Sequence, residues 1–121
     1  MTISEHEKTE STQDEIVLND IKARIVKNFV DIIVLVELSN QKSGLSGYDI
    51  IMVVHRKFGT LISSGTVYSI LYAIERKGLV RGILNGRKTA FTLTNEGYEF
   101  LYSITRSRKE LSKFMKDLFG S

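Results

Sequence analysis

The chain has 121 residues, of which 42% are hydrophobic and 26% charged, and this fits one domain with a modest core. The absence of cysteine excludes disulfides and thiolate metal sites, and the N-terminus lacks the basic patch and apolar run of a signal peptide. The net charge of +3 combines −5 over residues 1–20 with +8 over the other 101 residues, so the body is basic and suits a polyanionic partner. The most apolar segment, residues 32–36, is too short to span a bilayer, and we expect a cytoplasmic protein with no membrane partner.

Residues 1–15 carry almost no apolar side chains. Such a segment cannot offset the entropy lost on ordering by burying apolar surface. We therefore predict a disordered acidic tail over residues 1–15, with the folded chain beginning at residue 16.

The helical spacing of apolar residues predicts a first helix from about Ile16 or Asp20 to Leu38. The β-branched run at residues 32–36 favours a strand locally, but the longer helical period favours a helix. Its predicted buried face consists of Ile21, Ile25, Phe29, Ile32, Ile33 and Val36. A loop is expected at residues 40–44.

A second helix is predicted to begin at a capping box, in which Ser46 is followed by Asp49 three residues later. Gly59 is expected to end this helix. Its apolar face consists of Ile50, Ile51, Val54 and Phe58. A link of about four residues then leads into a third helix, which gives a helix-turn-helix arrangement.

The third helix is expected between a serine cap, Ser63 or Ser64, and Gly78, which permits the left-handed residue that ends a helix. Its buried stripe consists of Val67, Ile70, Leu71 and Ile74. The other face is uncharged and presents hydroxyl groups and aromatic rings, from Ser64, Thr66, Tyr68, Ser69 and Tyr72. Such a face is typical of a helix that lies on nucleic acid.

After Gly78 the apolar period changes from helical to alternating, and residues 79–84 and 88–93 are predicted strands. Asn85 and Gly86 between them form a strong hairpin signal, with both residues expected at positive φ. Arg87 and Lys88 follow directly and should project from the hairpin tip.

Thr94 is expected to cap a last helix that runs to about Leu118 and is roughly 36 Å long. An a/d seam runs along this helix, formed by Leu101, Ile104, Arg108, Leu111, Met115 and Leu118. Nothing left in the chain covers part of the seam, and a second copy in a two-fold homodimer is the simplest cover. We therefore predict a dimerisation helix at residues 94–121, after a DNA-binding domain at residues 16–93.

The order of three helices, a hairpin and a long helix is that of a winged helix-turn-helix domain, a mainly α (α+β) fold with a two-stranded β wing. Four segments resemble the PadR-like transcriptional regulators: 47–50 (GYDI), 64–71 (SGTVYSIL), 75–80 (ERKGLV) and 87–97 (RKTAFTLTNEG). The resemblance covers about residues 34–101, and the chain departs from the family pattern at Ser69 and Ala90.

The resemblance implies a homodimeric DNA-binding repressor whose C-terminal and first helices form the dimer. Some relatives bind aromatic or drug-like effectors near that interface. This chain offers Phe29, Phe100 and Phe114 there, but aromatic residues at helical spacing are more often plain core, so a small-molecule effector stays an open alternative without support from the sequence.

The candidate DNA contacts lie at the start of the third helix, on its outer face and on the wing. Free N–H groups at a helix start attract phosphate, and Gly65 would let the backbone approach the DNA closely. Tyr68 can either reach the DNA or pack between helices. Because the outer face lacks Arg, Asn and Gln, DNA shape is expected to supply part of the discrimination. The predicted contacts are Ser63, Ser64, Gly65, Thr66, Tyr68, Ser69, Arg87 and Lys88, with Tyr48 and Lys42 as weaker phosphate candidates.

The sequence contains no phosphate-binding loop, no nucleophile elbow, and no metal-ligand spacing around His6 or His55, so neither an enzyme nor a cofactor or metal is predicted. We predict a sequence-specific regulator, a homodimeric repressor that binds double-stranded DNA at a palindromic operator. Two alternatives stay open: an architectural protein that binds duplex without sequence preference, and a winged-helix module that uses the same face to bind protein.

Overall fold

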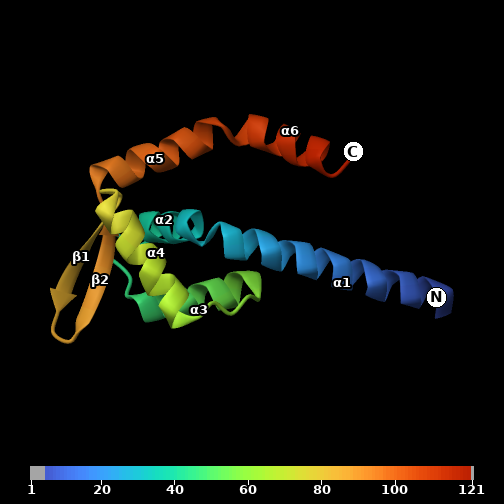
Figure 1. Ribbon diagram of the computed structural model, residues 1–121, viewed down its shortest axis with the longest axis horizontal. Helices are drawn as coiled ribbons and strands as arrows, with labels where there is room; N and C mark the ends of the chain where they lie inside the picture. The colour runs from blue at the N-terminus through green and yellow to red at the C-terminus, as the bar shows by residue number, and fades with distance from the viewer. Residues whose placement is uncertain (1–4, 121) are drawn as a thin grey trace.

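The computed structural model describes the backbone of residues 5–120 and the side chains of residues 12–120. Figure 1 shows a small body with a β wing at one side and helices that extend from the body on the other side. In chain order, the elements are α1 (Glu5–Asn28), α2 (Val30–Asn40), α3 (Gly47–Phe58), α4 (Ser64–Arg76), β1 (Val80–Asn85), β2 (Lys88–Leu93), α5 (Asn95–Arg106) and α6 (Arg108–Leu118). This is the predicted winged helix-turn-helix architecture.

The core is built around α2, which contacts α3, α4, α5 and β2. The fully buried apolar side chains of the core include Val34 and Leu35 of α2, Ile50 of α3, Leu71 of α4 and Phe91 of β2. Leu45 pairs with Phe91 through two backbone hydrogen bonds, so the loop before α3 is attached to the outer edge of β2. These contacts hold α3, α4 and the wing together as one unit.

The predicted buried face of the first helix is wrong for half of its six residues. Ile25, Phe29 and Val36 are 36%, 48% and 41% exposed. Ile33 packs against the core, and Ile21 and Ile32 are partly buried. The buried apolar side chains of this stretch are Val26, Val30, Val34, Leu35 and Leu38. Because α2 is apolar almost all round, spacing alone does not tell which stripe faces the core. The body therefore leaves a second apolar stripe uncovered along α1 and α2.

The first helix differs from prediction in two further ways. Residues 5–15 are helical and belong to α1, where disorder was expected; residues 1–4 lie outside the described residues. Glu, Lys and Gln are good helix formers, and extending an existing helix avoids the cost of nucleation. The chain also bends at Phe29 (φ −121°, ψ 26°), where the Asn28 side chain donates to the Arg24 carbonyl and competes with the helical bond.

The hairpin is present, but its turn is shifted by one residue. The strands pair from Val80↔Leu93 to Asn85↔Lys88, so the two central turn residues are Gly86 and Arg87. Only Gly86 has positive φ (66°) there, and no non-glycine residue of the described chain does. Positive φ at the first central position alone is the requirement of a type II′ turn, which replaces the expected turn centred on Asn85 and Gly86.

The last helix begins as predicted at Thr94, whose hydroxyl accepts from the Gly97 N–H and donates to the Gly78 carbonyl. It does not run straight to Leu118, because it bends at Ser107 between α5 and α6. The Ser107 hydroxyl donates to the Ser103 carbonyl at 3.0 Å, a side-chain bond that is known to bend helices. Within residues 5–120, no helix has the length and apolar character needed to cross a membrane.

Candidate nucleic-acid interface

The N-terminal end of α4 is exposed and rich in hydrogen-bonding groups. Ser63, rather than Ser64, is the cap: its hydroxyl accepts from the Thr66 N–H at 3.2 Å and donates to the Thr66 hydroxyl at 2.9 Å. Ser64 is the first helical residue, and its side chain is exposed. A Cβ added at Gly65 would meet no atom within 4 Å, so the backbone there is open to a partner. This end can therefore accept an anionic group against free backbone donors.

The outer stripe of α4 continues beyond these residues. Gly65, Ser69, Tyr72 and Arg76 are exposed and follow one another at spacings of four, three and four residues, which places them on one helix face. Tyr72 and Arg76 were missed as candidate contacts, although helical spacing from Ser69 was enough to include them. Arg76 gives this face a cation, but about 17 Å from Gly65, so the first two turns remain uncharged.

Tyr68 is only partly exposed and packs between helices, the second of the two predicted roles. A Cβ added at Gly47 would lie 2.4 Å from the Tyr68 ring, so the ring fills the space that the glycine leaves at the start of α3. Tyr68 therefore fixes α3 against α4 through its ring.

Two contacts couple α4 to the wing. The Tyr72 ring lies between those of Tyr68 and Phe91, with centroids 6.3 Å from each. About one turn further along α4, the Glu75 carboxylate accepts from the Gly82 N–H of β1 at 2.8 Å. Because α4 and the wing are joined at both places, they present their exposed groups as one surface.

Arg87 and Lys88 are exposed at the wing tip. The wing tip and the first turns of α3 and α4 lie at the same lower edge of the molecule (Figure 1). The Ser46 N–H donates to the Asp49 carboxylate at 3.0 Å, and this bond, together with the Ser46 hydroxyl and the Lys88 charge, holds the pKa of Asp49 below its ordinary value. The influence of Lys88 on Asp49 means that the wing cation lies within electrostatic reach of the α3 cap.

The weaker candidates lie near the same edge. Tyr48 is in the first turn of α3 and is 62% exposed, and Lys42 is exposed in the loop between α2 and α3. We use the name DNA-facing edge for the exposed candidate DNA contacts from the α2–α3 loop, the start of α3, the first turns of α4 with their cap, and the wing tip: Lys42, Tyr48, Ser63, Ser64, Gly65, Thr66, Ser69, Arg87 and Lys88.

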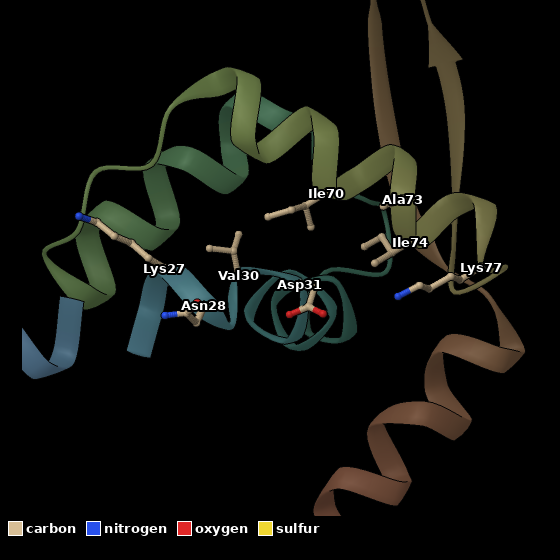
Figure 2. A pocket seen from close by; sticks show the side chains of 8 residues that line it. All are labelled: Lys27, Asn28, Val30, Asp31, Ile70, Ala73, Ile74 and Lys77. Atoms are coloured by element: carbon tan, nitrogen blue, oxygen red, sulfur yellow. The ribbon is translucent and has the colours of Figure 1, made fainter. Parts of the chain in front are cut away.

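Beside the outer stripe of α4 lies a cleft of about 250 Å³, where the end of α1 and the start of α2 meet α4. Figure 2 shows Val30, Ile70 and Ile74 lining it, with the charged side chains of Asp31 and Lys77 at its border. The cleft residues Ile70, Ile74 and Lys77 are turned away from Gly65, Ser69 and Tyr72 around the helix. The cleft is therefore separate from the DNA-facing edge. Among the described residues, no group of three or more His, Cys, Asp or Glu side chains could hold a metal ion.

The candidate dimerisation residues fall into two groups. Leu101 and Ile104 on α5 are partly buried against the body, whereas α6 buries none of its residues. Its exposed side chains include Arg108 and the apolar Leu111, Phe114, Met115 and Leu118, the last four being 39–61% exposed. Phe29, Phe100 and Phe114 are likewise 41–61% exposed. The interpretation of these three rings as plain core residues is therefore wrong for the single chain.

A scan against models of known families finds no match, and neither does a search of curated proteins. Solved structures do match. A PadR-like transcriptional regulator from Bacillus cereus is 21% identical with a TM-score of 0.67, over 81% of this chain and 98% of that one. A PadR family transcription regulator from Clostridium difficile is 26% identical with a TM-score of 0.62, over 77% and 99%. A transcriptional regulator from Clostridium thermocellum is 23% identical with a TM-score of 0.67, over 82% and 97%. The chain thus shares its winged helix-turn-helix fold with these PadR family regulators.

Proposed function

We propose that this protein is a DNA-binding transcriptional regulator that contacts duplex DNA through its DNA-facing edge. The observation that carries the proposal is the joint exposure, at one edge, of the open N-terminal end of α4 and the cations of the wing. In helix-turn-helix proteins, the N-terminal residues of the second helix contact base edges in the major groove. The solved structures with the same fold are named as transcriptional regulators, which supports the same role here.

The contacts divide by chemistry. The N–H groups at the start of α4 and the hydroxyl groups of Ser63, Ser64 and Thr66 suit phosphate oxygens, which fix position on the duplex. Ser69 lies one turn along the same face and suits a base edge in the groove. Arg87 and Lys88 supply charge beside the groove. In this arrangement α4 enters a major groove and the wing flanks it.

A homodimer is part of the proposal. The uncovered stripe of α1 and the apolar face of α6 both extend from the body in the same direction, away from the wing (Figure 1). Exposed apolar patches of this size on a small protein mark an interaction surface. A two-fold copy of the chain covers both helices. The two α4 helices are then related by two-fold symmetry and enter successive major grooves, which requires a palindromic site with half-sites about one helical turn apart.

We also propose repression, because a dimer that covers two successive major grooves excludes other proteins from the same stretch of DNA. The direct check is transcription in vitro from a promoter that contains the selected site, which should fall as the protein is added.

Selection from random duplexes tests the proposed sequence preference. The protein should enrich a palindromic sequence and bind it with a Kd of about 10⁻⁸ M or tighter at physiological salt, whereas random DNA should bind at least about a thousandfold more weakly. If no sequence competes better than random DNA while affinity falls steeply with salt, the protein is an architectural DNA binder instead.

A further inference from the structure

The wing tip carries an apolar side chain that nothing in the body covers. Leu84 is 71% exposed and lies one residue pair from the turn, opposite Thr89. Polar residues usually occupy such positions, because an exposed leucine at a hairpin tip adds nothing to the fold and favours association. The role of Leu84 therefore has to be sought outside the single chain.

The register fixes the face on which Leu84 lies. Side chains alternate along a strand, so Leu84 shares a face with Gly82, and through the pair Gly82↔Phe91 with the buried Phe91. The Phe91 ring contacts Tyr72 of α4, so this is the face of the wing that is turned toward α4. Leu84 thus continues the core-facing row of the wing to a point where the body has ended.

The surroundings of Leu84 are those of a DNA-binding element. The type II′ turn at Gly86 and Arg87 keeps the tip narrow, and Arg87 and Lys88 are exposed next to it. The minor groove is about 6 Å wide and attracts basic side chains, so Arg87 and Lys88 suit it, and it widens where an inserted side chain kinks the duplex. The first two turns of α4 hold no Arg, Lys, Asn or Gln, which leaves part of the sequence discrimination to other parts of the molecule.

We propose that Leu84 is an apolar wedge that inserts between two adjacent base pairs from the minor groove. The affinity for DNA then depends on how easily these two base pairs unstack. This inference rests on the proposed function and adds a specificity-determining residue to it. Leucine is one of the side chains that minor-groove proteins insert in this way, and the insertion kinks the duplex toward the major groove. Pyrimidine–purine steps unstack readily, whereas A-tracts are stiff and resist unstacking. The wing therefore favours DNA whose sequence is easily deformed where the wing binds.

The test compares two duplexes of about 30 base pairs that differ only where the wing would lie, one with TA steps and one with A-tracts. Fluorophores at the two ends report bending by energy transfer, and anisotropy reports affinity, both at low salt so that binding needs no known operator. The wild type should bend the TA duplex by roughly 20–90° and bind it about tenfold more tightly than the A-tract duplex, the order expected for one buried leucine side chain.

Three variants isolate the wedge. Leu84→Ala should bind both duplexes equally and leave them straight, while Leu84→Met, which keeps an apolar wedge, should retain the bend. Ile83→Ala is the matched control, because Ile83 is 49% exposed on the opposite face of the same hairpin, and it should behave as the wild type.

An unchanged bend with Leu84→Ala, or an equal loss with Ile83→Ala, overturns the wedge while leaving DNA binding intact. If the wild type binds neither duplex, both the proposed function and the wedge are lost. Circular dichroism of each variant should match the wild type, since Leu84 and Ile83 are 71% and 49% exposed and neither belongs to the core.

Discussion

Two glycines in helices have opposite surroundings. Gly97 in the first turn of α5 is buried, and a Cβ added there would lie 2.2 Å from the Leu79 carbonyl oxygen. Gly65 in the first turn of α4 has open space on all sides. Gly97 allows α5 to pack closely against the start of the wing, whereas Gly65 leaves room for an external partner.

Alanine substitutions should separate these two roles. Gly97→Ala should destabilise the protein by about 1–3 kcal/mol, because the backbone must move to admit the methyl group. Gly65→Ala should raise stability by up to about 1 kcal/mol through helix propensity, yet weaken DNA binding severalfold by blocking backbone approach. Urea denaturation and anisotropy titration measure the two effects. A Gly65→Ala variant with full DNA affinity would contradict the role assigned to that position.

The capping box of α3 predicts an acid-dependent part of stability. The pKa of Asp49 is lowered in the folded state, so its contribution is complete above the unfolded value of about 3.9 and is lost as pH falls through the folded value. Asp49→Asn should therefore be less stable than the wild type near neutral pH, and the difference should shrink below about pH 4. Urea denaturation at stepped pH checks this; a difference that does not change with pH would exclude the carboxylate as its source.

At the scale of elements, α4 and the wing act as one surface only while their connection holds. The Gly82 N–H of β1 has the Glu75 carboxylate as its acceptor, and the rings of Tyr72 and Phe91 form the second contact. A loosened wing would spread Arg87 and Lys88 over many positions relative to α4 and add an entropic cost to DNA binding.

Substitution of Glu75 tests this connection. Glu75→Ala removes the acceptor and should cost about 1 kcal/mol of stability, with faster amide exchange in β1 and severalfold weaker DNA binding. Glu75→Gln is the matched control, since it removes the same charge but keeps a carbonyl that can accept the bond. If the two variants show the same stability, amide exchange and DNA affinity, the negative charge of Glu75, and not its hydrogen bond to Gly82, connects α4 to the wing.

The elements set by local chemistry were predictable from the sequence. The capping box at Ser46 and the helix ends at Gly59 and Gly78 depend on residues a few positions apart, and the structure contains them as predicted. The bends at Phe29 and Ser107 were not foreseen, because each depends on one side chain competing for a carbonyl within an otherwise good helical pattern.

Helix order and the basic wing predict that the candidate DNA contacts share one edge, and the exposed candidates do lie together there. Individual side chains were harder to predict. The inward position of Tyr68 depends on the space at Gly47, which is distant in sequence, and the buried stripe of α2 depends on which neighbours cover it. Tertiary contacts, rather than local propensity, decided these cases.

In the whole molecule, α6 is the helix with the least cover. None of its residues is buried, and its large apolar side chains are 39–61% exposed to solvent, which supports the proposed dimer. Leu111→Glu combined with Leu118→Glu should give a monomer by light scattering, because two carboxylates cannot be buried in an apolar interface. Lys113→Glu, on the other side of α6, makes the same change in net charge and should remain dimeric. A dimeric double variant would place the interface elsewhere.

Charge reversal at the wing tests whether duplex DNA binds at the edge shared by α4 and the wing. Anisotropy titration of Arg87→Glu combined with Lys88→Glu should show affinity at least about tenfold lower, and a salt dependence reduced by about two phosphate contacts. The control is Lys22→Glu with Lys27→Glu, which makes the same change in net charge on α1. It should bind DNA with wild-type affinity when the two proteins are compared in the same oligomeric state. Wild-type DNA affinity in the wing variant would contradict the account and favour a protein partner for this edge.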